Sequence, residues 1–404
     1  MKKTTPLAHT REGGRGQMRP NHEVVLQAFA GRSVFVTGHT GFKGSWLSIW
    51  LHALGARVTG YALAPPTSPS NFEASGVRDL LVAHHEADLR DAASLHSALK
   101  AASPDVVFHL AAQPIVRESY ANPRETFDVN VMGTVNVLEA IRVLGKPCAV
   151  VVVTSDKSYE NREQAWGYRE CDALGGHDPY SASKGAAEII TASYRRSFFL
   201  PQRLQQHGVK LATARAGNVI GGGDWAKDRI LTDVVRHLQA GQPVPVRSPR
   251  AIRPWQHVLE PLGGYLSLAA RMLESNDPSW CDAWNFGPAP GEEIPVGQLV
   301  ELFVQAWGSG AWQDVSDPNQ LHEAGVLRLC IDKALHQLGW RPRWNVAEAI
   351  RRTADWFRRF YASLQYPLDR GALSEGESDS TSPDALTACR EDIEAYELPS
   401  LVPR

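Results

Sequence analysis

Two side chains that could carry out acid–base chemistry lie four residues apart in the sequence, at Tyr180 and Lys184. On a helix, residues at this spacing share one face. An ammonium group beside a phenol favours the phenolate and lowers the pKa of the phenol. Such a tyrosine can take the proton from a sugar hydroxyl while a nicotinamide takes the hydride. Because similar pairs are common on helix surfaces, the pattern indicates chemistry only together with a cofactor site.

A glycine-rich turn earlier in the chain has the sequence context of a cofactor site. It follows a short apolar run, 33–37, and opens an apolar stretch of helical length, 42–54. Glycines in this context allow a tight turn and a close approach of the backbone to a pyrophosphate at the helix N-terminus. A purely structural glycine turn is the alternative. The residues expected to contact the cofactor here are Gly38, Thr40, Gly41, Phe42, Lys43 and Gly44.

The segment after the second expected strand bears on which dinucleotide binds. It reads Ala62-Leu63-Ala64-Pro65-Pro66 and contains neither an acid for the adenine ribose nor a cation for a 2′-phosphate. The absence of a cation there favours NAD over its phosphorylated form. Asn130 is a further candidate contact, with a capping or packing amide as the alternative. The other expected cofactor contacts are Asp88, Leu89, Leu110, Ala111, Ala112 and Gln113.

The order of strand and helix signals predicts the fold class. Apolar strands alternate with helices from residue 32 to about 217, which predicts an α/β fold with a Rossmann-type, doubly wound parallel sheet. The later sequence is richer in loops and predicts a smaller α/β substrate-binding lobe at the carboxyl ends of the strands. The expected units are a disordered extension at 1–28, an NAD-binding domain at 29–217 to which later segments return, a lobe mainly for a sugar nucleotide at 218–366, and a polar tail at 367–404.

Composition excludes several classes of protein. The formal net charge of -2 argues against nucleic acid or an anionic membrane as a partner. No apolar run approaches the roughly 18 residues that a membrane span needs. The five cysteines are widely spaced and odd in number, which suits neither a disulfide framework nor a zinc site and predicts a reducing cytoplasm. We expect no metal site.

Longer motifs resemble those of the extended short-chain dehydrogenase/reductase family, and within it the 4,6-dehydratases that act on CDP-glucose. The resemblance runs from about Gly31 to about Leu364. The glycine turn and the Tyr-x-x-x-Lys pair are shared by very many members, whereas Ser155-Asp156-Lys157 and Gly222-Gly223-Asp224-Trp225 are far more selective. The resemblance also rests on His109–Gln113, Ala214–Gly221 and Ile252–Val258.

The resemblance implies an NAD-dependent conversion of CDP-glucose to CDP-4-keto-6-deoxyglucose. Tyr180 would take the proton of the C4 hydroxyl while the C4 hydride passes to NAD+. The C4 ketone acidifies the C5 proton, water then leaves across C5 and C6, and the hydride returns to C6. Since the cofactor ends as it began, it is expected to stay bound through turnover.

The elimination needs an acid and a base, and the resemblance places both after the strand at 149–154. Asp156 is the expected acid, because burial raises the pKa of a carboxyl group and keeps it protonated. Lys157 is the expected base for the C5 proton, with a mere pairing to Asp156 as the alternative. Ser155 is expected to hold the C4 oxygen beside Tyr180.

Several cationic and polar residues are candidates for contacts to the nucleotide. Guanidinium groups bind diphosphates in bidentate fashion, which makes Arg229 and Arg253 candidates. Arg247 has the same chemistry, with a solvated loop arginine as an equal alternative. For His257, a structural role fits the sequence better than an acid or base role. The full set of expected substrate contacts is Gln113, Ser155, Asn218, Arg229, Arg247, Arg253 and His257.

Two rival functions and the oligomeric state remain open in the sequence. A sugar-nucleotide 4-epimerase of the same fold would use Tyr180 and Lys184 without needing Asp156 and Lys157. A non-catalytic NAD-binding protein would usually lack the tyrosine or the lysine. The family pairs its subunits through two long helices, expected here at 126–144 and 180–206, so a homodimer or homotetramer is expected.

Overall fold

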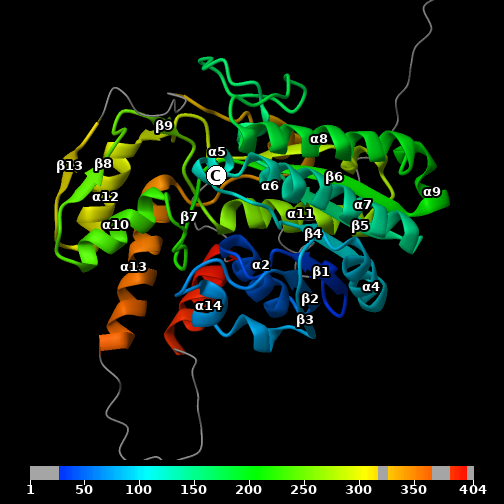
Figure 1. The fold of residues 1–404 in the computed structure, drawn as a ribbon, viewed down its shortest axis with the longest axis horizontal. Helices are drawn as coiled ribbons and strands as arrows, with labels where there is room; N and C mark the ends of the chain where they lie inside the picture. Colours follow the sequence, from blue (N-terminus) through cyan, green and yellow to red (C-terminus); the bar gives the residue numbers. More distant parts are fainter. Residues whose placement is uncertain (1–26, 317–325, 366–382, 398–404) are drawn as a thin grey trace, which may run out of the picture.

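A seven-stranded sheet forms the centre of the computed structural model, which describes residues 27–316, 326–365 and 383–397. Its strand order is β11-β6-β5-β4-β1-β2-β3, and every neighbouring pair is parallel. This is the predicted doubly wound arrangement, and the predicted fold class is confirmed (Figure 1). The strands are β1 (Ser33–Thr37), β2 (Arg57–Ala62), β3 (Ala83–Glu86), β4 (Val106–His109), β5 (Cys148–Val153), β6 (Val209–Ala216) and β11 (Ala283–Phe286).

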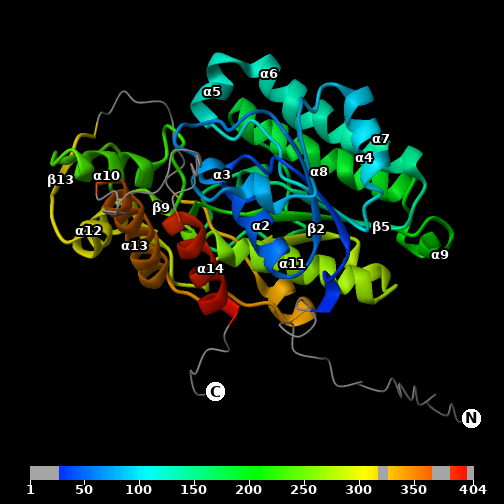
Figure 2. The same ribbon diagram turned by 90° about the horizontal axis from the view of Figure 1, so that it is seen from below.

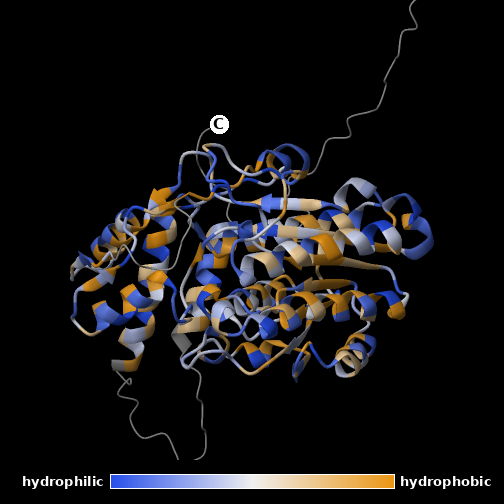
Figure 3. Cartoon of the chain, turned by 45° about the horizontal axis from the view of Figure 1, so that its top comes forward, coloured by the Kyte–Doolittle hydropathy of each residue, from blue (hydrophilic) through white to orange (hydrophobic). Residues whose placement is uncertain are grey.

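Helices cover both faces of this sheet, because its strands are apolar on both sides. In β1, Val34 and Val36 belong to one hydrophobic cluster and Phe35 to another. The first cluster includes α2 (Phe42–Ala53) and α11 (Leu259–Glu274). The second includes residues of α4 (Ala92–Ala102) and α7 (Gly133–Leu144), with α8 (Pro179–Ser197) packed against it. Figures 2 and 3 show these layers and the hydrophobic residues gathered on the central strands.

Two of the long helices expected from the sequence are interrupted. Helix α8 ends at Ser197, and Pro201 begins a separate short turn before α9 (Leu204–His207). The expected helix at 126–144 consists of α6 (Pro123–Phe127), a π-helical segment at Asp128–Met132 and α7. The expected bounds at 180–206 were therefore too long, since proline has no backbone N–H with which to continue a helix.

The smaller lobe lies beside the sheet, at the left of Figure 1. Its short strand β8 (Val244–Val246) pairs in parallel with β13 (Trp312–Asp314). Helix α13 (Val346–Gln365) packs against α12 (Val296–Trp307). Apart from the last helix, the other α-helices and β-strands of the described chain are α3 (Asn71–Ala74), α5 (Val116–Ala121), β7 (Val219–Ile220), α10 (Ile230–Gln239), β9 (Ile252–Arg253), β10 (Gln256–His257) and β12 (Ile294–Pro295).

A last helix, α14 (Pro383–Glu397), lies in the stretch expected to be a polar tail. Cys389 and Tyr396 are buried in the first hydrophobic cluster. The indole N–H of Trp50 in α2 donates to a carboxylate oxygen of Glu397 at 2.6 Å. This helix within the polar stretch packs beside α2 and α13 (Figures 1 and 2). The rest of the expected tail, and nearly all of the expected extension at 1–28, lie outside the described residues.

The described residues contain neither a candidate membrane-spanning helix nor a candidate metal site. No helix among them has both the length and the apolar character needed to cross a membrane. Within the same ranges, no group of three or more His, Cys, Asp and Glu side chains is arranged to hold a metal ion.

Candidate active site

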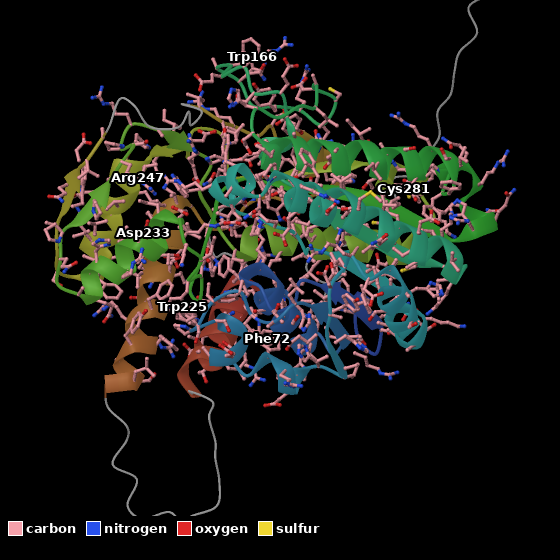
Figure 4. The ribbon with its side chains drawn as sticks, in the orientation of Figure 1. Phe72, Trp166, Trp225, Asp233, Arg247 and Cys281 are labelled. Atoms are coloured by element: carbon pink, nitrogen blue, oxygen red, sulfur yellow. The ribbon has the colours of Figure 1, made fainter. Side chains whose placement is uncertain are left out.

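A cavity of about 990 Å³ lies where the central strands end and the smaller lobe begins. The carboxyl ends of the central strands contribute Leu110, Val153 and Ala216 to its wall, and the lobe contributes Arg247 and Trp225. Figure 4 shows Arg247 within the lobe and Trp225 between the lobe and the sheet. In open α/β sheets, ligands bind outside the carboxyl ends of the strands. The cavity therefore has the position of a ligand site.

The glycine turn forms a backbone cradle at one end of this cavity. Gly38 has a φ of +75°, and a Cβ there would meet the backbone nitrogen of Ala111 at 2.7 Å. A Cβ on Gly44 would collide with the backbone of Gly38. A Cβ on Gly41 would meet only the carbonyl oxygen of Gly38, at 3.4 Å. Gly38 and Gly44 are thus required by packing, whereas Gly41 leaves open space that fits a pyrophosphate against the backbone.

Most of the residues expected to bind the cofactor line the cavity. Asp88 follows β3, and the Arg90 guanidinium that hydrogen-bonds it holds the pKa of Asp88 below its usual value. The Thr40 hydroxyl donates to the carbonyl of Leu63 at 2.9 Å and ties the turn to the end of β2. The expected cofactor residues in the wall are Gly38, Thr40, Gly41, Phe42, Lys43, Gly44, Asp88, Leu89, Leu110, Ala111, Ala112, Tyr180 and Lys184.

Gln113 and Asn130 do not belong to the wall, which corrects their expected roles as direct contacts. The Asn130 amide accepts from the backbone N–H of Gln113 at 2.8 Å and donates to Ser183 Oγ at 2.8 Å. The Gln113 side chain donates to the Thr126 hydroxyl at 2.9 Å. Both amides are occupied by protein groups, and together they fasten the loop after β4 to helix α8.

Tyr180 and Lys184 are buried in the first two turns of α8, and both line the cavity. The helix begins with Pro179 at its first position, and the Asp178 carboxylate accepts from the backbone N–H of Ser181 at 2.9 Å. The ammonium of Lys184 donates to the carbonyl of Val153 at 3.5 Å. The start of α8 is therefore fixed by its own cap and by the end of β5.

The predicted direction of the Tyr180 pKa is wrong. Burial raises this pKa above its ordinary value, and the hydrogen bond with Ser155 and the charge of Arg229 offset the rise only in part. Burial also lowers the pKa of Lys184 to about 8, against the opposing effect of Glu188. Burial disfavours the charged form of each group, so both pKa values move in the direction that favours the neutral form.

Asp156 has the environment expected of an acid. It lies in a 3₁₀ turn, Asp156–Ser158, directly after β5, where the Ser155 hydroxyl donates to its Oδ1 at 2.9 Å. Burial raises the pKa of Asp156, against the lowering effect of Lys157. Oδ2 is buried and accepts no hydrogen bond from the described residues. Ser155, Asp156 and Lys157 all line the cavity, so a carboxylic acid and an amine lie in the same chamber as Tyr180.

Lys43 has an environment that the sequence did not reveal. Burial lowers its pKa to about 7, and the charge of Arg229 acts in the same direction. The carboxyl groups of Asp156 and Asp224 act in the opposite direction. Asp224, in the Gly223-Asp224-Trp225 motif, lines the cavity and was not expected there as a functional group. The selectivity of that motif was the only signal that could have found it.

The expected substrate contacts divide into two groups. Asn218, Arg229, Arg247 and Arg253 line the cavity on the side of the lobe, together with Ser155. His257 does not, and it has the structural position that the sequence favoured over an acid or base role. Its ring packs edge-on against Trp46 and Trp344, with centroid distances of 5.8 and 4.9 Å. Burial lowers its pKa to about 3, so it is a neutral core histidine.

Residues 35–353 match the family described as GDP-mannose 4,6 dehydratase. The CDP-glucose 4,6-dehydratase of Salmonella typhimurium is 51% identical over 328 residues, which cover 81% of this chain and 91% of that protein. The dTDP-glucose 4,6-dehydratase of Streptomyces antibioticus is 30% identical over 335 residues, covering 81% and 92%. A crystal structure of Thermus thermophilus UDP-glucose 4-epimerase is 27% identical, with a TM-score of 0.65 over 80% of this chain and 98% of that one. The chain therefore belongs to the GDP-mannose 4,6 dehydratase family, within the extended short-chain dehydrogenases/reductases.

Proposed function

We propose that this protein is an NAD-dependent hydro-lyase that converts CDP-glucose into CDP-4-keto-6-deoxyglucose. The observation that carries the proposal is the buried carboxyl group of Asp156, whose pKa is raised, in the same cavity as Tyr180 and the glycine turn. An oxidation alone needs only the tyrosine and the cofactor, whereas loss of water also needs an acid. The 51% identity to a CDP-glucose 4,6-dehydratase supports CDP-glucose as the substrate.

NAD is the proposed cofactor. The backbone cradle at Gly38–Gly44 fits a pyrophosphate, and the end of β2 offers no cation for a 2′-phosphate. The related epimerase from Thermus thermophilus was crystallised in complex with NAD. Residues 29–217, with the segments that return to this domain, would hold the cofactor, and 218–366 would mainly hold the sugar nucleotide. When bound, NAD accepts the hydride from C4 of the sugar and later returns it to C6.

Replacing Gly41 by Ala is expected to weaken NAD binding at least about tenfold without unfolding the protein. The added methyl group meets only the Gly38 carbonyl oxygen, at 3.4 Å, and occupies space that a pyrophosphate needs. Binding is measured by calorimetry on protein from which cofactor has been removed. Gly287→Ala, whose new methyl group makes ordinary contact with Leu329 and Ile331, is the matched control. Equal NAD affinity in both variants would contradict the cradle assignment.

The residues of the chain would divide the reaction into an oxidation and an elimination. Tyr180 takes the proton from the C4 hydroxyl. Because burial raises its pKa, the phenolate depends on positive charge nearby, which Arg229 supplies and which the nicotinamide of NAD+ would add when bound. Ser155, beside Tyr180, would turn its hydroxyl from Asp156 Oδ1 to the C4 oxygen as negative charge develops on that oxygen. Lys157 then takes the proton from C5, and Asp156 gives its proton to the departing C6 hydroxyl. When hydride returns to C6, Lys157 gives the proton back to C5.

Lys157→Glu is expected to retain the first hydride transfer and to slow elimination by about 10²-fold or more. The reason is that Lys157 takes part only after C4 has been oxidised. Stopped-flow absorbance of NADH separates the two steps, because NADH forms in the first and is consumed after the second. Lys100→Glu, the same charge reversal on the exposed side of α4, is the control. Loss of the first NADH signal in Lys157→Glu alone would count against this division of roles.

The direct test of the proposed function is incubation of the purified protein with CDP-glucose. A 4-keto-6-deoxy product is recognised by its near-ultraviolet absorbance in base and by loss of one water in mass spectrometry. GDP-mannose, dTDP-glucose and UDP-glucose are tested in parallel to establish the nucleotide preference. A product of unchanged mass that is only the C4 epimer would replace the proposal with a 4-epimerase.

A homo-oligomer formed through α7 and α8 is also proposed, as a homodimer or as part of a homotetramer. Val143 on α7 and Ile189 on α8 are 58% and 59% exposed, and Phe198 at the end of α8 is 51% exposed. The two helices run side by side on one side of the molecule (Figures 1 and 2). Exposed large apolar side chains on two neighbouring helices are typical of an interface. A cytoplasmic location is proposed because all five cysteines are free thiols.

Ile189→Asp is expected to reduce the molar mass in solution to that of one chain, measured by size-exclusion chromatography with light scattering. A carboxylate in the centre of an apolar interface would lose its water without gaining a partner. Leu364→Asp, on the equally exposed side of α13, is the matched control and should leave the mass unchanged. An Ile189→Asp protein that keeps the wild-type oligomer would place the interface elsewhere.

A further inference from the structure

A buried ion pair outside the cavity wall connects the helix that carries Tyr180 and Lys184 with the turn that carries Asp156 and Lys157. Arg215 on β6 and Glu188 on α8 are joined at 2.9 Å, and each side chain is 3% exposed. Neither residue belongs to the wall of the cavity. Glu188 lies one turn beyond Lys184 and two turns beyond Tyr180, on the same helix face. The pair therefore anchors the helix that carries the oxidation chemistry.

The same guanidinium also reaches the turn that carries the elimination chemistry. Arg215 Nη1 donates to the Tyr159 hydroxyl at 2.7 Å and to the carbonyl of Glu170 at 3.2 Å. Tyr159 directly follows the 3₁₀ turn Asp156–Ser158, and its hydroxyl donates in turn to Asn285 at 2.8 Å. The Arg215 guanidinium additionally lies over the Tyr159 ring, 4.8 Å from its centroid.

Glu188 contacts the residue that precedes Ser155, on the N-terminal side of the turn Asp156–Ser158. Its two carboxylate oxygens accept from the hydroxyls of Thr154, the residue before Ser155, and Thr213, the latter at 2.7 Å. The segment from Thr154 to Tyr159 is thus held at both ends by one ion pair. A buried ion pair is costly unless additional hydrogen bonds satisfy its charges, and this pair has them.

We propose that Arg215 is a positioning residue that fixes Asp156 and Lys157 relative to Tyr180 and Lys184, so that one bound sugar meets both sets of groups. This inference rests on the proposed function, since it concerns the passage from oxidation at C4 to elimination across C5 and C6. Displacement of a reacting group by about 1 Å can cost 10²-fold in rate. Loss of the link to Tyr159 should therefore slow elimination selectively.

The test is Tyr159→Phe, which removes the hydroxyl that Arg215 and Asn285 contact and leaves the Arg215–Glu188 pair intact. Tyr159 lines the cavity but is 1% exposed, and its hydroxyl is held by these two protein groups. Stopped-flow measurements with CDP-glucose are expected to show a first NADH signal within twofold of the wild type. The decay of that signal, which reports elimination and hydride return, is expected to slow by tenfold to a hundredfold, on the scale set by such a displacement. Amide hydrogen exchange at residues 156–160 should become faster, with exchange in α8 unchanged.

Tyr168→Phe is the matched control. Its ring stacks on that of Tyr159 with centroids 5.2 Å apart, and its hydroxyl bonds to Asn161 and to the backbone N–H of Arg162, with no contact to Arg215. Tyr168→Phe should leave the rates of NADH formation and NADH decay in their wild-type ratio. Amide hydrogen exchange at residues 156–160 should also match the wild type. Equal slowing of both steps in Tyr159→Phe, unchanged exchange, or the same changes in Tyr168→Phe would overturn the inference. A wild-type protein that does not dehydrate CDP-glucose would instead overturn the proposed function.

Discussion

Replacing Asp156 by Asn is expected to reduce dehydration of CDP-glucose by roughly 10²- to 10⁴-fold, the range of a lost general acid. Asn has nearly the same shape as a protonated Asp but cannot give up a proton to the departing hydroxyl. Oxidation at C4 does not use this proton, so NADH should form at close to the normal rate and then accumulate. Stopped-flow absorbance of NADH and mass analysis of the quenched sugar nucleotide measure both effects.

The surroundings of Asp156 favour its protonated form, which is the form needed for elimination. The raised pKa comes first from burial, and the Ser155 hydroxyl occupies only Oδ1. Oδ2, which accepts no hydrogen bond from the described part of the chain, is the oxygen left to carry the proton. Asp79→Asn is the control, because it makes the same chemical change at an exposed residue that does not line the cavity. Normal dehydration by Asp156→Asn would remove Asp156 from the mechanism.

Replacing Tyr180 by Phe is expected to abolish the first step, with a loss of turnover of at least about 10²- to 10⁴-fold. The hydroxyl is buried beside Ser155, and no other described side chain has been assigned as base for the C4 proton. No NADH signal should appear when substrate is added, in contrast to Asp156→Asn. The pair of variants therefore separates a block in oxidation from a block in elimination.

Tyr194→Phe provides the control on the same helix. The Tyr194 hydroxyl donates to Glu139 at 2.7 Å and does not line the cavity. Its loss should leave turnover unchanged and alter only thermal stability by a small amount. If Tyr180→Phe turned over at the wild-type rate with an intact fold, the assignment of the base would be refuted.

Local sequence signals predicted the central sheet and most of the cavity wall. Strands β1, β4 and β5 are largely apolar runs, as is typical of buried parallel strands, whereas β2 and β6 carry polar residues among their apolar ones. The glycine turn was readable because steric crowding at Gly38 and Gly44 excludes a side chain at either position. Asp156 was assigned through the family resemblance, and its position shortly after a buried strand supports that assignment, because parallel sheets place functional groups there.

The errors concern properties that depend on contacts far apart in the sequence. The sequence favoured a structural role for His257, but its packing against Trp46 and Trp344 could not be predicted from the residues next to it. The pKa of Tyr180 rises because the surrounding protein removes water, and the Tyr-x-x-x-Lys spacing carries no information about that loss. The packing of α14 also depends on distant residues, since its few apolar side chains complete the hydrophobic cluster beside α2.

The path of the hydrogen at C4 tests the central claim most directly. CDP-glucose that carries deuterium at C4 of the glucose is incubated with the protein, and the product is examined by NMR and mass spectrometry. We predict a 4-keto-6-deoxy sugar with the deuterium at C6, because the hydride leaves and returns within one cavity. Deuterium that remains at C4 of an epimer, or that is absent from the C6 methyl group, would contradict the account.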